Sequence, residues 1–275
     1  PTLSIKTRTS LAAFHGYNYL LAKENLTDHL RVGDRKDKIR QRLWKIRAKK
    51  VIIATGAIER PLIFNNNDRP GILLSSSIKK YIDYYGVKCG NKISIFTSND
   101  SAYETVLSLY KNGVKVNSII DIRDKSESLI VKKVQDIGIK IYWKHTVVNT
   151  KGYKRINSIE LMKLNEKGTG VIGEKINESC DCLGISGGWT PMVHLFTQSG
   201  GKLEFNRIDN MFIPEENKSP SEQISVGSCN GDLELDDIIK KTNLKTKKFL
   251  DVNTSIFDSL KIQSSKEKNK KNIWL

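Results

Sequence analysis

The sequence predicts an α/β fold in which one parallel-sheet domain interrupts another. Three apolar runs each end in a glycine bend, at Ile53–Gly56, Ile185–Gly188 and Val226–Gly227, and a strand–helix–strand pattern lies between the first two. A continuous apolar run is typical of a parallel strand that is covered on both faces, and glycine lets the chain turn tightly beside a ligand. This layout is typical of flavoproteins of the glutathione and thioredoxin reductase kind, which contain two dinucleotide-binding domains.

The first part of the chain is expected to form a small antiparallel meander that ends in a buried strand. The stretch "PTLSIKTRTSLAAFHGYNYLLAKE" gives two or three short strands, and "QRLWKIRAKKVIIAT" continues the strand character. Residues Val51–Ile53 are β-branched and continuous, as in a strand covered on both faces. After a loop rich in proline and asparagine, "SSSIKKYIDYYG" predicts a short helix that Ser75 or Ser76 caps and Gly86 ends.

The strand–helix–strand pattern lies in "NKISIFTSNDSAYETVLSLYKNGVKVNSIIDIRD", residues 91–124. It predicts a strand at Ile93–Phe96, a helix at Ala102–Lys111 and a strand at Val116–Ile120, which form one βαβ half of a nucleotide-binding fold. A further helix, a hairpin and an apolar strand at Cys182–Ser186 follow. The stretch "EQISVGSCNGDLELDDIIKKTNLKTKKFL" then gives a strand, a glycine bend and a helix.

The domain boundaries are predicted from these elements. Residues 1–90 form the later part of the first half of the outer dinucleotide-binding domain, 91–183 form the inserted Rossmann-like domain, 184–250 return to the outer domain, and 251–275 are a linker. The opening strand and the G-x-G-x-x-G turn of the outer domain would precede Pro1. We therefore expect the first domain to be incomplete at its N-terminus and the chain to be an internal fragment.

The inserted domain departs from the dinucleotide fingerprint. In "IFTSNDSAYE" the three glycine positions are Thr97, Asn99 and Ala102. Asn99 places a side chain where a pyrophosphate must approach the backbone, and Asp100 adds a negative charge beside it. Asp121, about 20 residues further on, has the position of a ribose-binding acid. The sequence predicts that this domain keeps the fold and has lost the binding, and the absence of C-x-x-C here argues against dithiol chemistry.

Composition favours a globular protein of a reducing compartment. No run of 18 apolar residues and no signal-peptide pattern occurs, and the four cysteines form no zinc-site spacing, so the cytoplasm is expected. Of the net charge of +16, +8 lies in residues 31–50 and +4 in residues 261–275. A solvated basic surface explains this distribution better than a nucleic-acid-binding module, because aromatic residues are not interleaved with the basic ones.

Several stretches are more specific than a glycine motif. They are "RQRLWKIRAKKVIIATGAIERPLIFNNNDRPGILLSSSIKKYIDYYGV", "FTSNDSAYETVLSLYKNGVKV", "SGGWTPMVHLFTQSGGKLEF" and, more weakly, "SVGSCNGDLELDD". Together they cover most of residues 40–250 and closely resemble the alpha subunit of heterotetrameric sarcosine oxidases. In that family a small N-terminal domain precedes this region, and an aminomethyltransferase-like domain that binds tetrahydrofolate follows it.

The resemblance implies an oxidoreductase of sarcosine catabolism and one-carbon metabolism. Such an enzyme demethylates sarcosine to glycine at a flavin of the beta subunit, passes electrons through FMN near the alpha–beta interface to O2, and gives H2O2. The one-carbon unit leaves as formaldehyde or as methylene-tetrahydrofolate. The implied partners are the flavin-bearing beta subunit and the small subunits, which hold FAD and, at the interface, FMN. No complete active site, catalytic residue or metal is expected in this chain.

The same resemblance implies a tightly but non-covalently bound NAD at the glycine bends. The residues expected to line it are Ala54, Thr55, Gly56, Gly187, Gly188, Gly227, Ser228, Asn230 and Gly231. NAD is favoured over FAD because Ser228 stands where a flavoprotein of this layout has the acid that binds the ribityl chain. Asp232 lies close enough to keep FAD open, so the alternative is a fragment of an FAD-dependent dehydrogenase that acts on another amine or on an opine.

Overall fold

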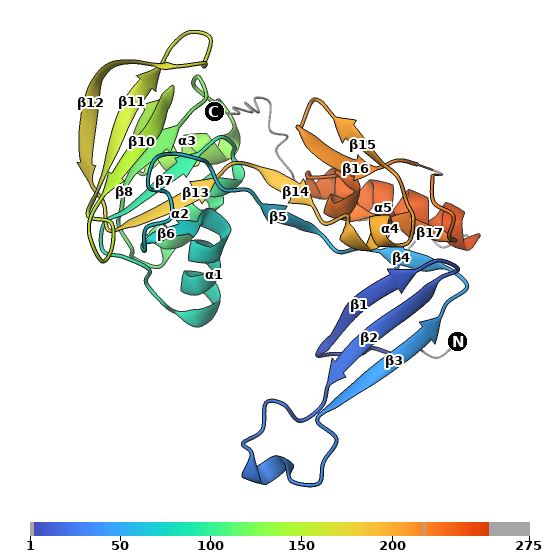
Figure 1. Ribbon diagram of the computed structural model, residues 1–275. Coiled ribbons are helices and arrows are strands. Elements are labelled where there is room, and N and C mark those ends of the chain that lie inside the picture. The colour runs from blue at the N-terminus through green and yellow to red at the C-terminus, as the bar shows by residue number, and fades with distance from the viewer. Residues whose placement is uncertain (1–2, 217, 253–275) are drawn as a thin grey trace. The chain divides into compact units, whose positions relative to one another are not determined.

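The computed structural model describes residues 3–216 and 218–252, which divide into two compact units. Unit 1 contains the described residues of Pro1–Ala57 and Pro191–Ser264, and unit 2 contains Ile58–Thr190. Figure 1 follows the chain from blue strands of unit 1 into unit 2 and back to the orange and red elements of unit 1. Within the described ranges, no helix is both long and apolar enough to cross a lipid bilayer.

Unit 2 alternates strands and helices and then continues into an antiparallel sheet. Its elements are β6 (Ile72–Leu74), α1 (Ser75–Tyr85), β7 (Ile93–Thr97), α2 (Ser101–Lys111), β8 (Val116–Asp121), α3 (Leu129–Asp136), β9 (Lys140–Trp143), β10 (His145–Lys151), β11 (Ser158–Leu164), β12 (Val171–Ser179) and β13 (Cys182–Ser186). The predicted strand–helix–strand pattern is confirmed, and β13 has the predicted bounds.

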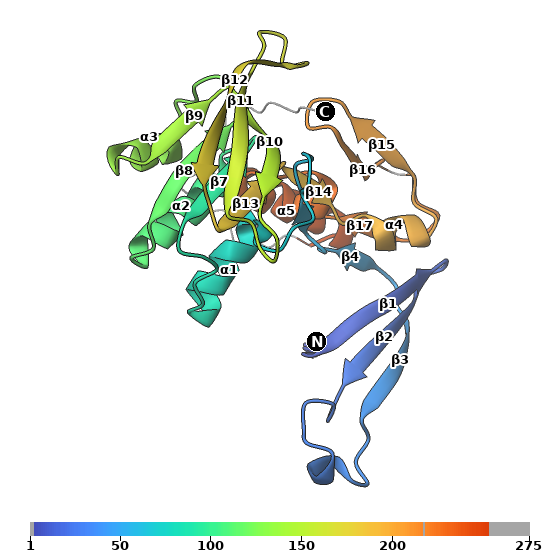
Figure 2. The same cartoon turned by 60° about the vertical axis from the view of Figure 1, so that its left-hand side comes forward.

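A five-stranded parallel sheet, in the order β6-β13-β7-β8-β9, forms the centre of unit 2. Strands β7 and β13 are buried along their whole length, as expected for parallel strands covered on both faces. Because neighbouring residues of a strand point to opposite faces, Ile95 packs with helices α1 to α3 whereas Phe96 packs against β10 and β11. The sheet therefore lies between a helical layer and an antiparallel layer (Figure 2).

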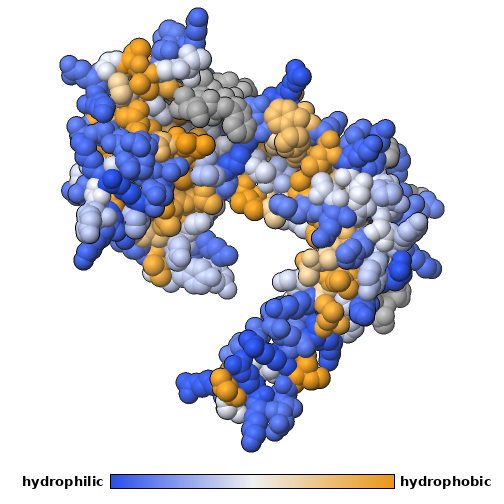
Figure 3. Space-filling view, in the orientation of Figure 1, coloured by the Kyte–Doolittle hydropathy of each residue, from blue (hydrophilic) through white to orange (hydrophobic). Residues whose placement is uncertain are grey.

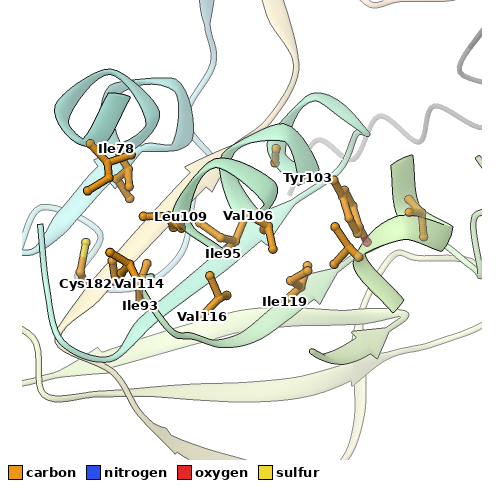
Figure 4. Close-up of a cluster of buried hydrophobic side chains, with 14 residues drawn as sticks. Ile78, Ile93, Ile95, Tyr103, Val106, Leu109, Val114, Val116, Ile119 and Cys182 are labelled. Carbon is orange, nitrogen blue, oxygen red and sulfur yellow. The ribbon is translucent and has the colours of Figure 1, made fainter. Parts of the chain in front are cut away.

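The helical side of the sheet carries the larger buried cluster of unit 2 (Figure 4). Val106 and Leu109, one helical turn apart on α2, are fully buried against Ile95 and Ile119 of the sheet. Removing an apolar side chain of this size from water stabilises the folded state by about 1.5–3 kcal/mol. The periodicity of α2 thus fixes the face that it presents to the sheet.

The two ends of α1 differ in how far the sequence predicted them. Gly86 ends the helix as expected, with φ at +64° and its amide bonded to the Tyr81 carbonyl oxygen. The predicted serine cap is wrong, because the capping position is Leu74, which makes no side-chain capping hydrogen bond. Instead the Glu59 carboxylate accepts a hydrogen bond from the Ser76 amide at 2.8 Å. A distant acid thus satisfies an unpaired amide of the first turn.

Unit 1 begins with the predicted meander and contains a short parallel sheet. Its elements are β1 (Thr9–His15), β2 (Tyr19–Asn25), η1 (Gly33–Arg35), β3 (Gln41–Arg47), β4 (Val51–Ile53), α4 (His194–Gln198), β15 (Leu203–Asn206), β16 (Met211–Pro214), β17 (Gln223–Ser225), η2 (Gly227–Asn230) and α5 (Leu235–Leu250). Strands β5 (Ala57–Glu59) and β14 (Trp189–Pro191) pair where the chain passes between the units. The predicted linker is 251–275, and its residues from 253 onward lie outside the described residues.

The core of unit 1 is small. Its buried cluster consists of Phe14, Leu20, Ile53, Phe196 and Cys229. In the described part of the chain, β4 pairs with β17 alone, in parallel register. The expectation that β4 is covered on both faces is correct for Ile53, which is 4% exposed, and wrong for Ile52, which is 38% exposed.

The basic stretch 31–50 forms an exposed surface at the end of the meander. Strand β3 is exposed at every position except Trp44, which is half-buried, and Figure 3 shows this end of the molecule mostly in hydrophilic colours. The Trp44 ring is covered by Lys6 and Arg42, whose charged groups lie 4.4 and 5.4 Å from its centroid. The aromatic face is thus occupied by the protein's own cations, which agrees with a solvated basic surface.

One charged cluster on the antiparallel sheet of unit 2 is expected to give a pH-dependent stability. The Glu160 carboxylate lies 2.7 Å from Lys151 Nζ and 3.3 Å from Lys175 Nζ. The hydrogen bond from Lys151 lowers the pKa of Glu160 to about 2. Because the folded pKa lies below the unfolded value, this stabilisation is present above about pH 4.3 and is lost as the pH falls toward 2.

The measurement is the unfolding midpoint of wild type and Glu160→Gln as a function of pH. The difference between them is expected to be constant at neutral pH and to shrink below about pH 4. A difference that does not change between neutral pH and pH 2 would show that the charge of Glu160 contributes nothing.

Candidate functional site

The two predicted bends of unit 1 lie together at the carboxyl ends of β4 and β17. The Val226 amide and the Cys229 thiol both donate to the Ile53 carbonyl oxygen, at 2.9 and 3.3 Å. A methyl group added at Gly56 would meet nothing nearer than Ser228 Oγ, at 3.9 Å, in the described part of the chain. The structure therefore brings Ala54–Gly56 and the 227–231 segment side by side, as the sequence predicts.

The glycines of these bends serve different purposes. Gly56, Gly227 and Gly231 have φ values of +79°, +72° and +92°, in the left-handed region that favours glycine. A Cβ at Gly231 would lie 2.7 Å from Ile213 Cγ2, so this glycine permits close packing. At Gly56 the nearest atom leaves room, so a ligand can approach the backbone there.

The side chains at the bends are polar and partly accessible. Ala54 and Thr55 are exposed, and Ser228 and Asn230 are half-buried. The Thr55 hydroxyl donates to the Met192 carbonyl oxygen at 2.8 Å, which fixes the bend after β4. The Asn230 side chain accepts from Lys245 Nζ and donates to the Asp232 carboxylate, each at 3.2 Å. The bends thus offer an ordered, hydrogen-bonding surface to a ligand.

The N-terminus of α5 is poorly suited to binding a phosphate. Asp236 and Asp237 lie in its first turn, Glu234 occupies the capping position without a side-chain capping hydrogen bond, and Asp232 lies two residues earlier. Carboxylates at a helix N-terminus interact with its positive end and repel a further anion. The local charges therefore argue against a pyrophosphate at this end of α5.

The third predicted bend, at Gly187 and Gly188, belongs to unit 2 and packs against its own loop. The Gly187 amide donates to the Arg60 carbonyl oxygen at 2.7 Å, and the Arg60 amide donates to that of Gly188 at 2.8 Å. A Cβ at Gly187 would lie 2.8 Å from the Pro61 carbonyl oxygen, and one at Gly188 would lie 2.9 Å from the Arg60 guanidinium. Close packing within unit 2 thus accounts for both glycines, and their contact with a cofactor stays a prediction.

The cysteines of the described residues are unpaired, and three of the four are buried. No group of three His, Cys, Asp or Glu side chains in that part of the chain has metal-binding geometry. All four cysteines are free thiols. Burial raises the pKa of Cys180 to about 11 and that of Cys182 to about 12, which favours the protonated thiol at neutral pH.

Comparison with known proteins identifies the region to which this chain corresponds. It is 36% identical over 211 residues to "Sarcosine oxidase subunit alpha" of Corynebacterium sp. (strain U-96), across 76% of this chain and 22% of that protein. The chain is similar to part of a sarcosine oxidase alpha subunit. The protein of the same name from Rhizobium meliloti (strain 1021) is 33% identical, across 74% of this chain and 19% of its own length. The resemblance noted in the sequence is thereby confirmed.

The chain spans about a fifth of the length of these sarcosine oxidase alpha subunits. No known protein-family model matches it. Among solved structures, the L-proline dehydrogenase of P. horikoshii has a TM-score of 0.59 at 20% identity, across 90% of this chain and 42% of that one. The thioredoxin reductase of T. acidophilum has a TM-score of 0.54 at 15% identity, across 81% and 66%. These likenesses confirm the predicted fold class.

Proposed function

We propose that unit 1 holds a tightly bound NAD and that the chain is the cofactor-holding part of a sarcosine oxidase alpha subunit. The observation that carries this proposal is the open space beside the Gly56 backbone, next to Ser228, at the carboxyl ends of two parallel strands. Ligands of open α/β sheets bind at this end of the strands. The similarity to sarcosine oxidase alpha subunits supports the choice of enzyme, and the glycine bends support the position of the nucleotide.

The contacts of Asp232 favour NAD over FAD. In an FAD site of this layout an acid would have to bind the ribityl chain, and Ser228 is neutral. The neighbouring acid, Asp232, is 7% exposed, and Lys241 Nζ lies 2.6 Å from its carboxylate. A carboxylate that is already paired would lose this partner on binding a ribityl hydroxyl. NAD has no ribityl chain and does not require that exchange.

The bound NAD supplies a nucleotide framework, and the residues of this chain bind and orient it. The backbone of Ala54–Gly56 would lie against the nucleotide, while Ser228 and Asn230 would offer hydrogen bonds from the facing bend. The oxidation of sarcosine to glycine would take place at the flavins of partner subunits. This division of labour agrees with a site whose described side chains are ordered polar groups.

The experiment is to express the full-length alpha chain by itself and to identify what it retains. After desalting and acid precipitation, the supernatant is analysed by chromatography with absorbance detection. We expect close to one NAD per chain, without flavin absorbance. FAD in place of NAD would support the amine or opine dehydrogenase alternative, and a chain free of nucleotide would overturn the proposed function.

A further inference from the structure

The carboxyl ends of β7, β8 and β13 in unit 2 meet at a polar cluster that excludes solvent. Ligands of open parallel sheets bind at this edge, so an empty or open crevice would be the default. Here Thr97, Asn99, Asp100, Asp121 and Ser186 are each at most 7% exposed. The edge is therefore filled by the protein's own side chains.

Arg123 is the centre of this cluster. It lies two residues after the end of β8 and is 1% exposed, although arginine is among the residues that are rarely buried. Its Nε and Nη2 lie 3.0 and 2.8 Å from the two carboxylate oxygens of Asp121, as a bidentate pair. Its Nη1 lies 2.7 Å from Asp100 Oδ1. One guanidinium thus joins the end of β8 to the turn that precedes α2.

Asp121 has no oxygen left for a ribose. Besides the bonds from the Arg123 side chain, it accepts from the Arg123 amide at 2.9 Å and from the Tyr103 hydroxyl at 2.8 Å. Burial raises the pKa of Asp121, and the hydrogen bonds from Arg123 act against that shift. The expectation that Asp121 has the role of a ribose-binding acid is therefore not supported by its partners.

Asn99 closes the other side of the crevice. Its amide nitrogen lies 3.2 Å from the Ser186 carbonyl oxygen and 3.1 Å from Ser186 Oγ, at the end of β13. Its side-chain oxygen accepts from the Ser101 amide at 3.1 Å, at the start of α2. A dinucleotide-binding fold has a glycine here, which lets the pyrophosphate approach the backbone. In this chain the Asn99 side chain instead connects the end of β7 to β13 and to the start of α2 by hydrogen bonds.

We propose that Arg123 and Asn99 take the place of a nucleotide in unit 2, so that Arg123 determines that this unit binds no dinucleotide. The guanidinium fills the crevice and is held there by the Asp100 and Asp121 carboxylates, which would themselves repel a pyrophosphate. A nucleotide could enter only by displacing a buried ion pair, which is strongly unfavourable because both charges would need new partners. Unit 2 then acts as a rigid framework, a role that goes beyond the NAD site proposed for unit 1.

The first test maps where a nucleotide binds. The full-length alpha chain is photolabelled with an azidoadenine analogue of NAD, digested and analysed by mass spectrometry. We expect no labelled peptide from residues 93–124. A label there that is displaced by NAD overturns the inference. Label in peptides that contain Gly56 or Ser228 tests only the NAD site proposed for unit 1. One proposal can therefore be wrong while the other is right.

The second test asks whether the crevice requires a guanidinium. Arg123→Ala leaves two buried carboxylates without their cation, and we expect its unfolding midpoint to fall by about 10 °C. Methylguanidinium should raise that midpoint more than sodium at equal ionic strength, and it should not raise that of wild type. Arg123→Lys, which keeps the charge without the planar fork, should lie between them. Equal unfolding midpoints for wild type and both variants would overturn the inference, and so would a methylguanidinium effect on Arg123→Ala no larger than that of sodium. If Arg123→Ala does not fold, an unfolding midpoint of Arg123→Lys equal to that of wild type would overturn it.

Discussion

Replacing Gly56 by valine is expected to abolish NAD retention by the full-length alpha chain. The added side chain would occupy the open space beside Ser228, where a Cβ has its nearest described neighbour at 3.9 Å. Valine is also disfavoured at a φ of +79°, which adds strain of about 1–2 kcal/mol. The measurement is the amount of NAD that remains per chain after purification. We expect less than about a tenth of the wild-type content, because a blocked approach loses the affinity of the whole nucleotide.

The control must separate the blocked space from the backbone strain. Gly113 follows α2, has a φ of +70°, and a Cβ added there would have no described atom within 4 Å. Gly113→Val therefore carries a similar strain in the other unit, without facing the proposed site. It should lower the unfolding midpoint as much as Gly56→Val and retain NAD. If Gly56→Val retained as much NAD as wild type, these bends could not be part of the cofactor site.

The sequence predicted unit 2 well because its signals are local. Each signal lies within a few residues: the apolar run of β7, the spacing of the apolar residues in α2 and the glycine that ends α1. A continuous apolar run in such a short segment predicts a strand that is buried on both faces. The parallel sheet follows from the βαβ order of these elements. The meeting of the bends after β4 and β17 was predicted from the layout of two-domain flavoproteins, and the structure shows that these two strands are parallel neighbours.

The partners that close unit 2 could not be predicted from local signals. Asn99 and Asp100 in the fingerprint turn indicated that binding was lost, and they gave no sign of what fills the space. Arg123 lies in a polar stretch that resembles an ordinary surface loop, and its burial depends on two carboxylates, which the fold brings to 2.7 and 2.8 Å from its guanidinium. The serine cap of α1 failed in the same way, because Glu59 reaches that helix from 17 residues away.

The remaining large effect concerns a glycine in the centre of unit 2. A Cβ at Gly184 of β13 would lie 2.6 Å from Ile95 Cδ1 and 2.9 Å from Ile78 Cδ1. Gly184→Ala is therefore expected to destabilise the protein by about 1–3 kcal/mol, the usual range for overpacking a core. The measurement is the free energy of unfolding from denaturant titration. Gly16→Ala is the control, since no described atom lies within 4 Å there and its φ lies outside the left-handed region.

A double-mutant cycle can attribute that loss to the contact between α1, β7 and β13. Ile95→Val removes the Cδ1 atom nearest to the new methyl group and by itself costs about 0.5–1.5 kcal/mol. Combined with Gly184→Ala, it should cost less than the sum of the two single changes, because each change relieves the defect of the other. Relief will be partial, since Ile78 still faces the methyl group from α1. Strict additivity would show that β13 shifts away from β7 instead, and that glycine at this position is not required for the close approach of the helical layer to the sheet.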